Sequence, residues 1–186
     1  MPRRDPPDMT MRASRKRFRG DSRGASATEF ALILPIAVLT LICEYTFGEV
    51  LAISRKVAIT GRTITDLIAR RPSVTNDTLT TILNASAKIV APYASENMSI
   101  VVAALATDAS GQTKVTWSRA LNGSALTSGA SFTLPTGMAR ASTNLIYGSV
   151  RYTYAPIVGA RLLPTFPITF PFYINPRVTS SIPLTN

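Results

Sequence analysis

The feature that most constrains the fold is an uncharged apolar run at residues 30–43, which lies between Glu29 and Glu44. As an α-helix this run would extend roughly 21 Å, at about 1.5 Å per residue. A bilayer core of roughly 30 Å needs about 20 residues, so the run fits a membrane segment, a signal-peptide core or a buried helix. Apolar residues continue past Glu44 as far as Ile53 and lengthen the candidate span to about 24 residues.

A transmembrane helix at residues 25–53 has to accommodate the carboxylate of Glu44. An acid in mid-membrane costs roughly 2.5–3.5 kcal/mol on insertion scales, whereas each Leu, Ile, Phe or Val favours insertion by about 0.3–0.6 kcal/mol. Because about ten strongly apolar residues outweigh one acid, we predict a single-pass helix, kinked at Pro35. Glu44 then either has a partner or a neutralising proton within the membrane, or lies at the outer interface beside Tyr45.

Residues 1–24 form a basic segment that we predict to be a disordered cytoplasmic leader. They hold eight basic and three acidic side chains, a net charge of +5, which is half of the +10 of the whole chain. Three prolines and few apolar residues disfavour a folded structure there. A basic arm can bind nucleic acid, but beside an apolar helix it is more typical of a cytoplasmic flank. We therefore expect no nucleic-acid partner.

The carboxylate of Glu29 lies at the start of the predicted helix, where the helix dipole favours negative charge. If the chain is cut after Gly24, Ala25 carries the new ammonium group and Glu29 lies about one helical turn away. Glu29 could then pair with an amine of its own or of a neighbouring chain. Without cleavage, Glu29 stabilises the helix start, with Ser26 or Thr28 near the N-cap. The residues alone leave both interpretations open.

This segment resembles the start of the TadE-like family, pseudopilin-like proteins of the tight-adherence (Flp-type) pilus machinery. The resemblance covers about residues 22–71. The residues that carry it are Arg23-Gly24, Ala25, Glu29-Phe30, Pro35 within the apolar run, and Glu44-Tyr45 followed by Gly48.

The resemblance implies that a prepilin peptidase cuts between Gly24 and Ala25, and that Glu29 and Glu44 take part in subunit assembly. Ala25 differs from the bulky first residue of many pilins. The implied protein is a minor pilin or a structural component of pilus assembly in the bacterial inner membrane. Its N-terminus would be cytoplasmic and its C-terminal domain periplasmic. Its partners would be membrane lipid, pilin subunits and other pilus-assembly proteins.

The alternative is a secreted or membrane-anchored extracytoplasmic binding module with an ordinary signal anchor. Such a module needs a small-x-small cleavage site soon after the apolar run. The best match, at residues 50–52, is poor.

Beyond the span, residues 54–71 are predicted to extend the helix into the periplasm and to pack on the domain that follows. Gly61 weakens this helix by about 1 kcal/mol relative to Ala and marks a soft spot, and Pro72 ends it. Apolar residues recur on one stripe at helical spacing: Val50, Ile53, Val57, Ile64, Leu67 and Ile68.

Residues 72–186 are predicted to form a small periplasmic domain with an antiparallel sheet, which makes the fold class α+β. A helix capped by Thr75 or Asn76 comes first. Alternating or apolar runs then predict strands at 98–106, 114–121, 144–154 and 166–174. The first two form a hairpin around Ser110-Gly111, residues 122–137 form a long loop, and two prolines confine the last strand to a sheet edge.

Several residue types that catalysis would need are missing. The chain has no histidine, which excludes Ser-His and Cys-His pairs and histidine metal ligands. No glycine pattern resembles a phosphate-binding loop, and the acids are scattered along the chain. The single cysteine, Cys43, excludes an intrachain disulfide. We expect no enzyme activity, cofactor or metal.

The aromatic residues of the C-terminal half fit two interpretations. They could form the core or a partner-facing surface of the sheet, or they could gather in a surface-binding patch. Alternation along the strands favours the first. The residues concerned are Trp117, Tyr147, Tyr152, Tyr154, Phe166, Phe170, Phe172 and Tyr173.

Overall fold

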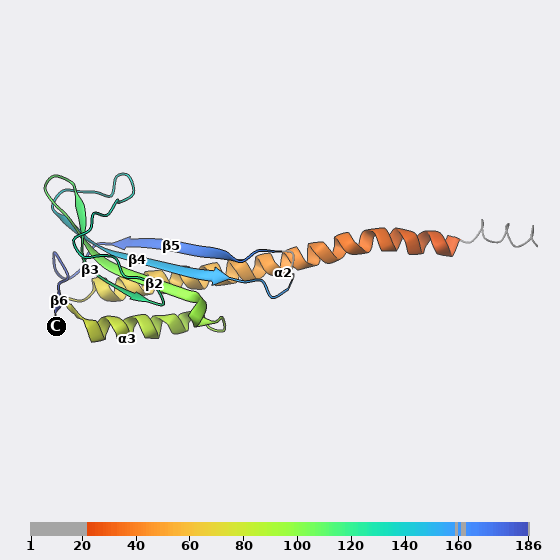
Figure 1. Ribbon diagram of the computed structural model, residues 1–186, viewed down its shortest axis with the longest axis horizontal. Helices are drawn as coiled ribbons and strands as arrows, with labels where there is room; N and C mark the ends of the chain where they lie inside the picture. Colours follow the sequence, from red (N-terminus) through yellow and green to blue (C-terminus); the bar gives the residue numbers. More distant parts are fainter. Residues whose placement is uncertain (1–21, 159, 161–162, 186) are drawn as a thin grey trace, which may run out of the picture. The chain divides into compact units, whose positions relative to one another are not determined.

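The computed structural model describes residues 22–158, 160 and 163–185, without the side chains of residues 22 and 23 (Figure 1). The chain forms two compact units, Met1–Tyr45 and Thr46–Asn186. Helix α2, Ser22–Ala69, contributes residues to both. It begins three residues before the predicted start and ends two before the predicted end. The part of the predicted leader at residues 1–21 lies outside the described residues.

The α+β class is confirmed: a long apolar helix precedes a small domain with an antiparallel sheet. The second helix is capped as predicted, because the Thr75 hydroxyl accepts a hydrogen bond from the Thr78 backbone N–H at 3.1 Å. The elements after α2 are β1 Val74–Thr75, α3 Asn76–Ala87, η1 Lys88–Val90, η2 Ser95–Asn97, β2 Met98–Thr107, β3 Thr113–Leu121, β4 Thr143–Tyr154, β5 Phe166–Ile174 and β6 Leu184–Thr185.

The sheet of the second unit has the strand order β3-β2-β4-β5, with antiparallel neighbours throughout. The prediction that residues 166–174 form an edge strand is confirmed. Pro167 and Pro171 are four residues apart in β5. Because the strand repeats every two residues, both backbone nitrogens point to the same side. β5 is the last strand in the order, so it has a free edge, and a missing N–H on that edge breaks no ladder hydrogen bond.

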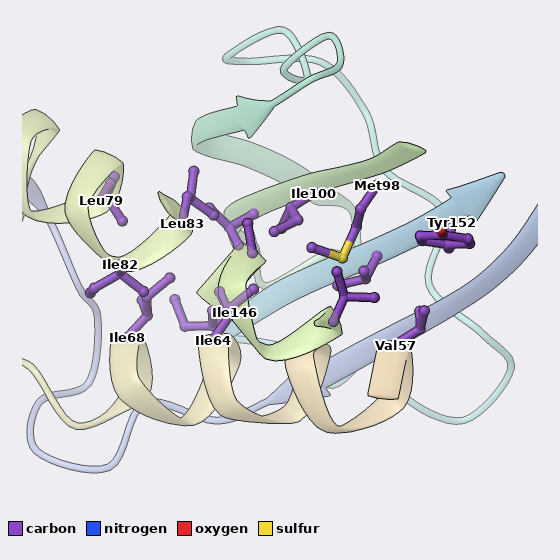
Figure 2. Close-up of a cluster of buried hydrophobic side chains, with 14 of the residues drawn as sticks. Val57, Ile64, Ile68, Leu79, Ile82, Leu83, Met98, Ile100, Ile146 and Tyr152 are labelled. Carbon is purple, nitrogen blue, oxygen red and sulfur yellow. The ribbon is translucent and has the colours of Figure 1, made fainter. Parts of the chain in front are cut away.

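Helices α2 and α3 cover one face of this sheet, and the core lies between them and the strands. Alternate residues of β2, among them Met98 and Ile100, point to this face and are fully buried. Figure 2 shows apolar side chains from both helices and from β2 and β4 pointing toward one another. The predicted stripe of α2 supplies Ile53, Val57, Ile64 and Ile68 to this core. Leu67 is an exception, because it is 43% exposed.

The opposite face of the sheet carries a second, smaller apolar cluster. A β-bulge in β3 places Trp117 opposite Ala104 but Val115 opposite Leu105, so Trp117 enters the main core and Val115 the smaller cluster. Residues 122–137, predicted as a plain loop, fold over this cluster. The loop side chains that pack on it are Leu126, Phe132 and Leu134.

The turn between β2 and β3 is organised by Asp108. Its carboxylate accepts hydrogen bonds from the Ser110 hydroxyl at 2.6 Å and from the backbone N–H groups of Ser110 and Gln112, both at 2.9 Å. The Ser110 hydroxyl, followed by the Gln112 N–H, lowers the pKa of Asp108 below its ordinary value. Gly111 adopts a positive φ of 81°, which favours glycine, so the predicted turn at this position is confirmed.

The C-terminal segment closes the end of the domain, which the sequence did not indicate. The Arg177 backbone N–H donates to the Ala69 carbonyl at 2.8 Å and so satisfies one of the last carbonyls of α2. Further along, the Trp117 indole N–H donates to the Ile182 carbonyl at 2.7 Å. β6 then pairs in parallel with β1.

Helix α2 approaches the sheet most closely at two glycines. A Cβ atom on Gly61 would lie 2.2 Å from the ring of Phe172, and one on Gly148 would lie 2.4 Å from the methyl group of Thr65. Gly148 and Phe172 are register partners on β4 and β5. The Thr65 hydroxyl donates to the Gly61 carbonyl at 2.7 Å, which fixes the direction of its methyl group. Gly61 is therefore a packing residue in addition to a weak point of the helix.

We predict that Gly148→Ala destabilises the domain. Thr65 is fully buried and its hydroxyl is hydrogen bonded, so its methyl group cannot turn away from a new Cβ atom. Overpacking of this kind costs about 1–3 kcal/mol of unfolding free energy. The measurement is denaturant unfolding of the full-length protein in detergent, followed by the fluorescence of the single tryptophan, Trp117.

The control is Gly48→Ala in α2. No atom lies within 4 Å of a Cβ atom built there, and Ala favours a helix over Gly by about 1 kcal/mol. This variant should be as stable as the wild type or more stable. Equal stability of Gly148→Ala and the wild type would contradict the close-packing explanation.

Candidate functional site

The candidate site is the N-terminal part of α2, where apolar side chains lie exposed around the whole helix. Consecutive residues of a helix are about 100° apart, so three in a row cover every side. Leu32 is 74% exposed, Ile33 62% and Leu34 44%. The same holds farther along at Ile36, Val38, Leu39 and Leu41.

The length and hydropathy of this helix make it a candidate membrane span. The candidate covers Gly24–Ala69, and its most apolar 18-residue window has a mean hydropathy of 2.0. Only 6% of that window is buried, so the window is not a core helix of the described domain. A helix that is apolar all round is either buried in protein or immersed in lipid.

Two threonine hydroxyls within this segment are satisfied by the helix itself. The Thr40 hydroxyl donates to the Ile36 carbonyl at 2.9 Å, and the Thr28 hydroxyl donates to the Ala25 carbonyl at 2.8 Å. Neither hydroxyl therefore needs water or a partner helix. Pro35 lies inside α2 and lacks an N–H, so the carbonyl of Ala31 loses its usual helical partner.

The two carboxylates that bound the apolar run, Glu29 and Glu44, are both exposed. Neither forms an ion pair or a hydrogen bond with a residue that the structure describes. They lie 15 positions apart, which is about 22 Å along a helix. A carboxylate in apolar surroundings needs a partner or a proton, so each is a candidate contact for another chain or for a lipid headgroup.

Gly24 and Ala25 lie in the first turn of α2, both exposed, and no atom lies within 4 Å of a Cβ atom built on Gly24. The expected cleavage point is thus unobstructed by the described part of the chain. Removal of the residues before Ala25 would leave Glu29 about one turn from the new N-terminus, as the sequence predicts.

Glu49, to which no sequence pattern assigns a role, anchors the sheet to α2. The Tyr154 hydroxyl at the end of β4 donates to the Glu49 carboxylate at 2.8 Å. Tyr152 lies two residues before Tyr154 in β4. Burial, followed by the negative charges of Glu96 and Glu49, raises the pKa of Tyr152 above its ordinary value. No local sequence pattern joins Glu49 to Tyr154, because 105 positions separate them.

The domain itself offers shallow hollows rather than a built catalytic centre. A hollow of about 510 Å³ lies beside the starts of β4 and the C-terminal segment, with Arg140, Asn144 and Tyr173 among its lining. Within the described ranges, no three His, Cys, Asp or Glu side chains gather where they could hold a metal ion. Most of the eight aromatic residues contribute to the apolar clusters: Trp117, Tyr152 and Tyr154 are buried in the core, Phe166 and Phe170 pack against it, and Tyr147 packs on the smaller cluster.

Comparisons of the chain with protein-family models, with curated proteins and with solved structures found no match.

We predict that Tyr154→Phe lowers the stability of the domain. Hydrogen bonds to charged groups contribute about 1.5–3 kcal/mol, and Glu49 is half-buried. Unfolding free energies of Tyr154→Phe, Glu49→Gln and the double variant, measured in detergent, form a double-mutant cycle. The cycle separates this hydrogen bond from the other contacts of both residues. Additive effects of the two substitutions would contradict a direct interaction.

Proposed function

We propose that this chain is a membrane-anchored subunit of a pilus-assembly system of the tight-adherence (Flp) type, a TadE-like minor pilin or structural component. The observation that carries the proposal is the apolar segment of α2, exposed on every side and bounded by Glu29 and Glu44. Water would not accommodate such a surface, but a bilayer or a bundle of like helices would.

In this proposal the helix stores the subunit in the inner membrane until assembly. The basic leader at residues 1–24 holds the N-terminus in the cytoplasm, since positive flanks stay on that side. The domain that follows α2 then lies in the periplasm. Five basic residues beyond the apolar run, at 55, 56, 62, 70 and 71, reduce the charge asymmetry but leave the leader as the denser cluster.

Assembly would proceed through the N-terminal end of the helix. Cleavage between Gly24 and Ala25 by a prepilin peptidase would remove the leader and create an ammonium group. Glu29, which has no basic partner among the described side chains, would then pair with the ammonium group of its own or a neighbouring chain. Charge pairing in an apolar helix bundle fixes register, because an unpaired carboxylate there is costly.

The alternative, a module released by cleavage after an ordinary signal anchor, conflicts with the packing of α2. Such cleavage would fall at residues 44–55. Ile53 belongs to the core of the domain, and Glu49 accepts the hydrogen bond from Tyr154. A cut in this region would remove residues that the folded domain uses.

Mass determination of the mature N-terminus separates these possibilities. The proposal predicts a chain that begins at Ala25. An intact Met1 would exclude cleavage after Gly24 and leave open an uncleaved TadE-like anchor. A start between residues 44 and 55 would contradict the proposal and support the released module.

We predict that Glu29→Ala abolishes incorporation of the subunit into the assembled pilus or its base complex, because the amine loses its carboxylate partner. The domain should fold normally, since Glu29 lies outside the unit that holds the core of the domain. The measurement compares the amount of subunit in sheared pili and in membranes. Thr28→Ala, an exposed neighbour in the same turn, is the matched control and should assemble normally. Normal assembly of Glu29→Ala would overturn the assigned role.

A further inference from the structure

The connection between β4 and β5 carries strongly exposed apolar side chains. Ile157 is 81% exposed, more than any other large apolar side chain in the described ranges, and Val158 is 40% exposed. Isolated apolar residues on a surface are ordinary. The position of these two within the domain is what makes them informative.

Ile157 lies at the end of the domain where α2 enters it. The hydrogen bond from Tyr154 to Glu49 holds the end of β4 against α2. Glu49 lies only three residues after Thr46, where the domain begins. Ile157 follows Tyr154 by three residues and so lies within roughly 11 Å of it, at no more than 3.6 Å per residue. Figure 1 shows the end of β4 and the start of β5 beside this part of α2.

Two further apolar side chains are exposed at the same end, Phe47 at 65% and Leu51 at 43%. Each is two residues from Glu49, and a spacing of two residues corresponds to a rotation of about 200° around the helix. Phe47 and Leu51 therefore lie on the far side of α2 from the bond to Tyr154. We call Phe47, Leu51, Ile157 and Val158 the apolar end patch.

The distribution of the apolar end patch indicates its occupant. Phe47 and Leu51 lie on one side of α2, and Ile157 and Val158 belong to the connection after β4, the strand whose end bonds to the other side. A single docked protein would cover one side. A lipid surface through which the helix passes meets all sides at once. Exposed basic side chains follow at a short distance: Arg55 is between one and two turns beyond Glu49, and Arg151 is three residues before Tyr154. Such cations suit anionic headgroups.

We propose that the domain rests on the membrane surface, with the apolar end patch inserted at the headgroup level. This inference depends on the proposed membrane span of α2, which already includes Phe47 and Leu51. Through Ile157 and Val158 it adds a contact between the sheet domain and lipid that the span alone does not require. The sheet domain would then be held against the bilayer before assembly and would have to leave it when the subunit is extracted.

Site-directed spin labelling tests the proposal on the full-length protein. A Cys43→Ser background leaves a single cysteine, introduced by Ile157→Cys, by Val178→Cys or by Leu39→Cys. Val178 is the matched control, because it is apolar and 60% exposed. Val178 lies at the other end of the domain, because it follows Arg177, whose backbone N–H donates to the Ala69 carbonyl. Ala69 is about 30 Å from Glu49 along α2. The protein is reconstituted into vesicles of phosphatidylethanolamine and phosphatidylglycerol.

The readout is a ratio for each label: its collision rate with oxygen, which concentrates in lipid, divided by its collision rate with a water-soluble nickel chelate. We expect a ratio several-fold higher at position 157 than at position 178. A ratio at 157 equal to that at 178 would overturn the proposal. Low collision rates with both reagents at 157 would also overturn it, since they would indicate a protein contact.

The label at position 39 separates this inference from the proposed span. A high ratio at 39 with a low ratio at 157 would leave the span intact and remove only the surface contact. Low ratios at both positions would remove the membrane anchor as well.

Discussion

The constraint on which the rest of the structure depends is an apolar helix surface that the described part of the chain leaves uncovered. Residues 30–43 contain no charge, and consecutive side chains from Leu32 to Leu34 are exposed around the helix. Burial of one such side chain is favourable by about 1.5–3 kcal/mol, so the whole run strongly favours lipid or other helices over water. The Thr28 and Thr40 hydroxyls bond to the helix itself, which removes an obstacle to insertion. The carboxylates at the two ends of the run still need partners, as does the Ala31 carbonyl, which Pro35 leaves without its helical bond.

In the second unit, the same helix is part of a protein core. From Ile53 onward, one stripe of α2 packs on a four-stranded sheet. Gly61 and Gly148 allow the helix and the sheet to approach closely, and Glu49 bonds to the end of β4. The C-terminal segment then fixes the end of the helix through Arg177. Pulling on the helix would therefore act directly on the sheet, because these contacts hold both together within the domain.

Local patterns were sufficient to predict most elements. The uncharged run, Pro72, the cap at Thr75 and the alternation around Ser110-Gly111 each depend on neighbours in sequence, and the corresponding helices and strands are present. The missed features depend on distant partners. The bond between Glu49 and Tyr154, the contact of Gly61 with Phe172 and the pairing of β6 with β1 join positions about 105 to 111 residues apart. The processing site at Gly24 and Ala25, the kink at Pro35 and the assembly roles of Glu29 and Glu44 stay predictions, because no contact in the described part of the chain tests them.

The most direct measurement is the behaviour of the full-length protein when cells are broken without detergent and the membranes are washed with alkaline carbonate. Carbonate removes proteins held only by charge or by surface contact, but it leaves transmembrane helices in the bilayer. The account predicts that the protein stays in the membrane pellet until detergent is added. Recovery of the intact chain in the aqueous fraction before any detergent is present would contradict it.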